Sequence, residues 1–222
     1  MKRGFPQPVS RDLNQPLSAY AQRRIMDFTV LIHRQVLAHS TEMAEALQEL
    51  EKQIRQIIRA VPPEPLRELR RVRIWLEWEN NPRGAAEYHP SAEWLREHGY
   101  NPEKAGNVEI NNARNFVQWS RGEQPWMLLH ELAHAYHHQV LGYENRMVLI
   151  AYRHAMQRGL YEQVEYIRGG KQKAYATTNV QEYFAELSEA YFGKNDFYPF
   201  TREELARHDP VGYKMIERAW QV

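Results

Sequence analysis

The sequence predicts an α+β fold in which a small mixed sheet with helices forms the first part of the chain and helices dominate the second part. Short apolar or alternating segments, typical of strands, occur mainly before residue 120. Longer segments with apolar residues at helical spacing occur throughout the chain and predominate after residue 142. Of the 222 residues, 43% are hydrophobic, which is enough for a core, and no repeat or low-complexity linker divides them. We therefore predict one domain, residues 1–222, built from two lobes.

The N-terminal lobe is predicted to span residues 21–142, after a polar, proline-containing surface arm at residues 1–20. Residues 40–60 have one apolar stripe at helical spacing, and the Pro62-Pro63 pair ends that helix. Residues 72–78 alternate apolar and polar side chains, which is typical of a half-buried strand. The other predicted elements of this lobe are strands at 28–32, 108–110 and 116–119 and a short helix at 91–98 that Gly99 stops.

The C-terminal lobe, residues 143–222, is predicted to be mainly helical. Its first helix covers residues 144–158 and is stopped by Gly159. The Gly169-Gly170 pair is typical of a hairpin turn. The remaining elements are hairpin strands at 161–167 and 173–177, a helix at 179–192 closed by Gly193, and a terminal helical segment that Thr201 begins with Glu204 as a capping box.

One pentapeptide, residues 130–134, has the residue types of a hydrolytic metal site. His130 and His134 are four residues apart, so on a helix both imidazoles project from one face and can reach one metal ion. Glu131 is rotated by about 100° from His130, to where it can touch a water bound to that metal. Two nitrogen ligands, an acidic base and an open position are typical of a zinc site built for hydrolysis. The alternative is two histidines packed in a helix with a surface glutamate between them.

The residues around the pentapeptide favour a buried helix. Pro125 suits the first turn of a helix, and Gly142 suits the cap at its C-terminal end. A helix that packs inward would hold two ligands rigidly. Its apolar face consists of Leu128, Leu129, Leu132, Ala133, Tyr136 and Val140.

A catalytic zinc site needs a third protein ligand. The metzincin arrangement requires glycine at position 137 and histidine at position 140, where this chain has His137 and Val140, so it is excluded. The other common solution is a glutamate on a later helix, and Glu182 and Glu186 lie four residues apart on one helical face. Zinc would offset the free-energy cost of burying the Glu182 carboxylate. Glu186 would hydrogen-bond the far ring nitrogen of a ligand histidine. Alternatively, Glu182 closes a capping box with Asn179, and Glu186 lies on a solvated face.

A resemblance to a known family favours the first interpretation. Residues 175–186, Tyr-Ala-Thr-Thr-Asn-Val-Gln-Glu-Tyr-Phe-Ala-Glu, together with the upstream pentapeptide, resemble the gluzincin zinc metallopeptidases, especially the catalytic domain of anthrax lethal factor. The match covers residues 125–142 and 175–200, and the segment 182–193 also resembles that of a group of bacterial and fungal proteins. It departs from the thermolysin type, which has aspartate where this chain has Glu186 and a later catalytic histidine for which His208 has no supporting context.

The resemblance implies a zincin-like fold and a zinc-dependent peptidase. By position, it implies that His130, His134 and Glu182 bind Zn²⁺, with Glu186 behind them. Glu131 is then the general base that takes a proton from water and passes it to the leaving amine. Tyr175 would donate a hydrogen bond to the developing oxyanion. An extended peptide or protein substrate would pair with the edge of strand 108–110 or 116–119.

Composition limits the other possibilities. The formal net charge of +1 gives no electrostatic reason to expect nucleic acid or an anionic membrane as a partner, and no apolar run is long enough to span a bilayer. Without cysteine, any metal must be held by histidine, aspartate or glutamate. No export signal begins the given chain, although it also fits a mature secreted form, and the compartment and oligomeric state stay open.

Two other classes of function compete with a peptidase. One is a non-catalytic protein in which zinc stabilises an interaction module, and the other is a metal-free helical module. The presence of Glu131 argues against the first, because a purely structural zinc site has no use for a base there, and zinc analysis separates the second from the other two. We expect His137 and His138 to lie behind the site or on the surface, because an added strong ligand would close the open position.

Overall fold

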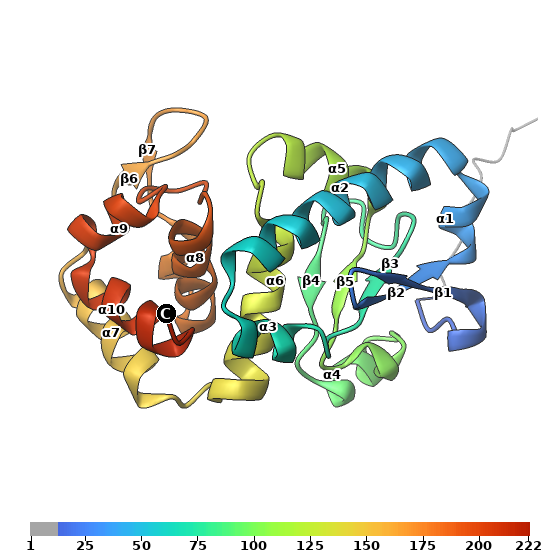
Figure 1. The fold of residues 1–222 in the computed structure, drawn as a ribbon, viewed down its shortest axis with the longest axis horizontal. Helices are drawn as coiled ribbons and strands as arrows, with labels where there is room; N and C mark the ends of the chain where they lie inside the picture. The colour runs from blue at the N-terminus through green and yellow to red at the C-terminus, as the bar shows by residue number, and fades with distance from the viewer. Residues whose placement is uncertain (1–12) are drawn as a thin grey trace, which may run out of the picture.

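The computed structural model describes residues 13–222 and contains a five-stranded mixed sheet (Figure 1). The strand order is β1-β2-β3-β5-β4. β2, β3 and β5 are parallel, whereas β1 and β4 are each antiparallel to their neighbour. The predicted α+β class with a small mixed sheet is therefore confirmed. The strands are β1 Tyr20–Ile25, β2 Phe28–His33, β3 Ile74–Leu76, β4 Glu87–Tyr88 and β5 Val108–Ile110.

The sequence predicts β2 and β5 from their apolar residues, but it gives no signal for β1. The middle residues of β1 are exposed and polar, so they do not alternate with buried ones. Its turn into β2 uses Met26 and Asp27 at φ of 46° and 73° instead of the usual glycine. Most of the predicted surface arm, residues 1–12, lies outside the described part of the chain, and Leu17–Ala19 form a short 3-10 helix before β1.

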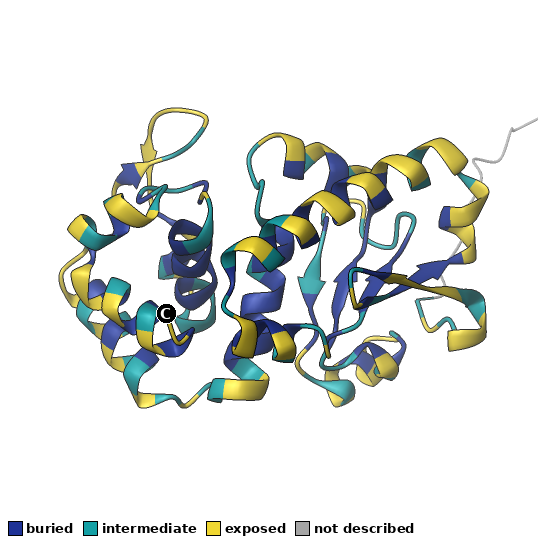
Figure 2. Ribbon diagram, in the orientation of Figure 1, coloured by how far each residue is buried: buried dark blue, intermediate teal, exposed yellow. Residues whose placement is uncertain are grey.

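Helices cover the sheet, and the longest of them, α2, packs against α5 (Figure 1). The predicted apolar stripe of α2 is buried while its other face is exposed (Figure 2). The predicted strand at 116–119 is wrong, because these residues belong to α5. Asn112 caps that helix by accepting a hydrogen bond from the Asn115 N–H at 3.0 Å. The helices here are α1 Arg34–Ala38, α2 Ser40–Ala60, α3 Pro63–Leu69, α4 Ala92–Glu97 and α5 Ala113–Arg121.

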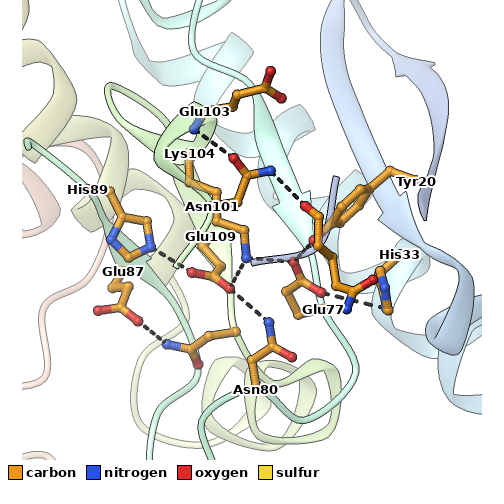
Figure 3. A network of polar contacts seen from close by, with 12 residues as sticks. Tyr20, His33, Glu77, Asn80, Glu87, His89, Asn101, Glu103, Lys104 and Glu109 are labelled. Carbon is orange, nitrogen blue, oxygen red and sulfur yellow. Dashed lines mark hydrogen bonds and ion pairs between the residues drawn. The ribbon is translucent and has the colours of Figure 1, made fainter. Parts of the chain in front are cut away.

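A buried charge cluster fixes the sheet on the face opposite its apolar core (Figure 3). Lys104 is fully buried, and its Nζ lies 2.7 Å from Glu77 Oε1 and 2.6 Å from Glu109 Oε1. Nε2 of His89 lies 2.6 Å from the other oxygen of Glu109, and the Tyr20 hydroxyl donates to Glu77 at 2.5 Å. Each buried charge therefore has an opposite charge or a hydrogen bond to offset its loss of hydration.

The second part of the chain is mainly helical, as predicted. The predicted capping box is confirmed, because Thr201 and Glu204 exchange hydrogen bonds at the start of α9. The predicted hairpin strand 161–167 is reduced to two residues, and the predicted strand 173–177 is wrong, because its place in the hairpin is taken by residues 171–172 and Tyr175–Thr177 form the 3-10 helix η4. In the described residues no helix is both long and apolar enough to cross a bilayer. The elements are α7 Arg146–Gln157, β6 Val164–Glu165, β7 Lys171–Gln172, α8 Val180–Phe192, α9 Arg202–His208 and α10 Pro210–Ala219.

The helix α6, Met127–Tyr136, connects the two parts. It contacts α2, α3, β4 and β5 on the sheet side and α8 on the helical side (Figure 1). It begins two residues after Pro125, which is therefore not in its first turn. A π-helical turn, His137–Leu141, follows and ends at Gly142, whose φ of 78° suits a glycine cap as predicted. Val140 in that turn is 43% exposed, so it does not belong to the buried face.

The charge cluster predicts sensitivity to acid. Burial raises the pKa of Glu109, but the hydrogen bond with His89 and the charge of Lys104 outweigh burial and lower it to about 2, from an ordinary value of 4.5. Because the pKa is lower in the folded state, the carboxylate contributes stability that is complete above about pH 4.5 and is lost as the pH falls towards 2. We expect urea unfolding at successive pH values to reveal a loss on the order of 3 kcal/mol.

Two glutamine variants control this prediction. Glu109→Gln should be less stable at neutral pH, yet its stability should fall less steeply below pH 4.5, because the titrating group is gone. Glu165→Gln makes the same change at an exposed position and should keep the wild-type slope. Parallel stability curves for wild type and Glu109→Gln would contradict the assignment.

Candidate metal centre

A cavity of about 1150 Å³ opens where β4, α6, η4 and α8 meet. Its lining includes all six of the residues that the sequence predicts for the site, although they come from separate segments of the chain. Residues 85–88 on the β4 side and Asp196 and Phe197 after α8 complete much of the wall. The six residues are His130, Glu131, His134, Tyr175, Glu182 and Glu186.

Three of these side chains converge on one point. Oε2 of Glu182 lies 3.0 Å from Nε2 of His130 and 3.2 Å from Nε2 of His134. Ligands that surround zinc tetrahedrally at about 2.0–2.1 Å lie roughly 3.3 Å from one another. One ligand atom from each of the three residues lies within 4.8 Å of the others, so the set fits a single ion. Two imidazole nitrogens and a carboxylate oxygen are also the donors that zinc prefers.

The packing of α6 on α8 positions these ligands. His130 and His134 are one turn apart on α6, with ring centroids separated by 4.8 Å. Near the start of α6, the Trp126 ring lies against Gly193, which follows α8. A Cβ atom on residue 193 would lie 1.8 Å from Cε2 of that ring, so only glycine allows this approach. The spacing of the two helices therefore depends on a residue without a side chain.

The alternative interpretation, in which Glu182 closes a capping box with Asn179, is met only in part. Asn179 Oδ1 accepts a hydrogen bond from the Glu182 backbone N–H at 2.8 Å, so Asn179 is the helix cap. The Glu182 carboxylate faces the two histidines. Burial raises its pKa, but the hydrogen bonds from His130 and His134 outweigh burial and hold it well below its ordinary value. The carboxylate is thus held in its charged form.

The predicted role of Glu186 is wrong, because Glu189 occupies that position. Oε1 of Glu189 lies 2.6 Å from Nδ1 of His130, whereas Glu186 accepts a hydrogen bond from Asn195 Nδ2 at 3.2 Å. A residue seven positions along a helix returns to within about 20° of the starting direction, whereas four positions leave about 40°. Glu189 is seven residues after Glu182, so the helical repeat was the signal that could have identified it.

Glu131 and Tyr175 lie on the cavity wall beside the three converging groups. Glu131 is buried, and burial raises the pKa of its carboxyl, which makes it more basic than a surface glutamate. The Tyr175 ring is 49% exposed, and its centroid lies 6.5 Å from that of His130. Burial of part of the ring and the nearby Glu182 charge raise the pKa of Tyr175, so its hydroxyl keeps a proton to donate at neutral pH.

The other histidines considered above do not line the cavity in the described part of the chain. His137 is fully buried against Phe184, and burial lowers its pKa to about 4, so it is neutral at neutral pH. Nδ1 of His138 lies 2.7 Å from the Tyr88 hydroxyl. Nε2 of His208 lies 2.8 Å from the carbonyl oxygen of Leu160. Each of the three histidines therefore has a partner other than the converging ligands.

The predicted substrate edge is also wrong in both of its versions. Residues 108–110 form β5, which is paired on both sides by β3 and β4, and residues 116–119 are helical. The strand that borders the cavity at the edge of the sheet is β4. It has two residues and gave no sequence signal.

No protein-family model matches the chain, and neither a curated protein nor a solved structure matches it.

Proposed function

We propose that this protein is a zinc-dependent metallopeptidase of the gluzincin type with a zincin-like fold. The observation that carries the proposal is the approach of one Glu182 oxygen to the Nε2 atoms of His130 and His134, at 3.0 and 3.2 Å, on the wall of a large cavity. Three protein ligands beside an open cavity are typical of catalytic zinc, whereas structural zinc is usually enclosed by four.

The chemistry divides between the ion and the protein. Zinc, when held by these three residues, supplies Lewis-acid polarisation of a carbonyl and activation of water. Glu131 accepts the proton of the attacking water and delivers it to the leaving amine. Tyr175 donates its O–H to the carbonyl oxygen as negative charge develops there. Glu189 bonds to Nδ1 of His130, which orients the ring so that Nε2 faces the ligand position.

We also propose that the substrate is a peptide or protein in an extended conformation. β4 is the edge strand of the described sheet beside the cavity, so its free side can pair with a substrate backbone. Such pairing would place a substrate carbonyl in the cavity that Glu131 and Tyr175 also line. Hydrolysis of an amide bond is the reaction that this base and this donor suit.

The ligand set predicts one equivalent of zinc. Glu182→Ala should abolish tight binding, because it removes one of three ligands. Glu189→Gln should weaken binding by about 10–100-fold, since it alters only the partner of His130 Nδ1. Glu144→Ala, at an exposed glutamate, should bind like wild type. Metal analysis and zinc titration test these values, and a native protein that neither contains nor takes up zinc would refute the proposal.

The role of Glu131 predicts loss of hydrolysis without loss of metal. An amide cannot accept the proton of water, so Glu131→Gln should keep its zinc and fold but cleave about 10²–10⁴-fold more slowly. A proteome-derived peptide library digested by wild type and by this variant identifies substrates and measures the difference together. Equal cleavage by both proteins would exclude Glu131 as the base.

Tyr175→Phe separates a catalytic tyrosine from a packing one. Loss of one oxyanion donor should lower kcat by about 10²–10³-fold while KM and zinc affinity change little. The ring remains, so any contact it makes with His130 remains too. Steady-state kinetics on a substrate from the library give both constants, and an unchanged kcat would leave Tyr175 with no part in the reaction.

A further inference from the structure

The wall of the cavity carries many more acidic than basic side chains. Among residues 13–222, the only lysine or arginine that lines it is Lys173, which is exposed and whose Nζ lies 3.1 Å from Oε1 of Glu162, outside the lining. The acidic side chains of the wall are Glu87, Glu131, Glu182, Glu186, Glu189 and Asp196. One zinc ion would balance only part of this charge.

Four of the six carboxylates have an assigned partner or role. Glu182 faces two histidines, Glu189 bonds to His130, and Glu87 accepts a hydrogen bond from Asn111 at 2.8 Å. Glu131 serves as the base of the proposed reaction. The two that remain, Glu186 and Asp196, have no part in that reaction.

Glu186 and Asp196 are buried without a cation. Their exposures are 3% and 6%, and no ion pair with either occurs in residues 13–222. Each carboxylate has a neutral hydrogen-bond donor, which is Asn195 Nδ2 for Glu186 and a backbone N–H for Asp196. A carboxylate removed from water is costly unless it is paired. Burial accordingly raises the pKa of both carboxyls; the Asp196 charge raises that of Glu186 further, and the Glu189 charge helps raise that of Asp196 to about 7.

The surroundings suit an organic cation better than a second metal ion. A metal bound by His130, Glu186 and Glu189 would have to compete for Nδ1 of His130, which already lies 2.6 Å from Glu189. The Phe197 ring lies on the same wall, next to Asp196 in the chain. A lysine or arginine side chain has an apolar stem for such a ring and a charged head for the two carboxylates.

We propose that Glu186 and Asp196 form a subsite for a lysine or arginine side chain of the substrate. The inference deepens the proposed peptidase function and rests on it for the nature of the substrate. A carboxylate oxygen of Glu186 lies within 4.8 Å of a ring nitrogen of His130, so the subsite adjoins the metal ligands. The basic residue therefore lies at a position flanking the bond that is cleaved.

Cleavage specificity tests the proposal. Wild type should enrich lysine or arginine at one position beside the cleaved bond of a peptide library. For the best such peptide, Asp196→Asn should lower kcat/KM by about 10–100-fold, and it should affect the norleucine analogue much less. Glu186→Gln is a second variant, in case Asp196→Asn folds poorly. Glu123→Gln is the matched control, because its carboxylate is nearby but already contacts Arg168 and Tyr166. Equal wild-type cleavage of lysine and norleucine peptides would overturn the proposal.

A binding experiment makes the test independent of activity. n-Butylguanidinium, which has the head and stem of an arginine side chain, should bind to wild type, Glu131→Gln and Glu123→Gln in calorimetry and at least tenfold more weakly to Asp196→Asn. Binding with this pattern but without peptide cleavage would retain the cation subsite and refute the peptidase. Peptide cleavage without a preference for basic residues and without binding of the probe would retain the peptidase and refute the cation subsite. A second zinc equivalent that Asp196→Asn loses would overturn the proposal in favour of a metal.

Discussion

The packing of α6 between the sheet and α8 is the constraint on which the cavity depends. The buried face of α6 contacts β4 and β5 on one side, and α8 lies against it on the other (Figure 1). Because His130 and His134 occupy this helix, neither can move without moving the core around them. The close approach of Trp126 to Gly193 fixes the far end of the same contact. The cavity is thus one end of an interface that stability already requires.

The molecule has two groups of buried carboxylates, and only one of them is paired with a lysine. Glu77 and Glu109 share the ammonium of Lys104, so the charge of that cluster is balanced mainly from within. Glu186 and Asp196 line a cavity and have no cation of their own among the described residues. A structural cluster satisfies its charges internally, because any residual charge costs stability. An acidic pair beside an opening is instead available to a cation that enters it.

The sequence predicts the features that depend on residues close together in the chain better than those that depend on contacts between distant segments. The α6 and α8 helices and the two histidines rest on local periodicity and on a motif, which can be read along the chain, whereas the choice of Glu182 rests on the family resemblance. To choose Glu189 over Glu186 as the partner of His130, one needs the direction in which each side chain leaves α8 relative to α6. Counting one helical turn along the sequence gives that direction only approximately. The role of β4 as the edge strand required the order of the sheet. That order is set by the pairing of β5 with β3 and β4, and a two-residue strand carries no periodicity of its own.

The separation of the converging residues along the chain has a consequence for biosynthesis. His130 and Glu182 are 52 residues apart, with α7 and the small hairpin between them. On the ribosome, both histidines emerge well before the glutamate that completes the set. Until α8 is made and docks on α6, the nascent chain has two imidazoles and no third donor. On the proposed function, tight metal uptake would therefore follow completion of the second half of the protein, and the half-made chain would carry no competent hydrolytic centre.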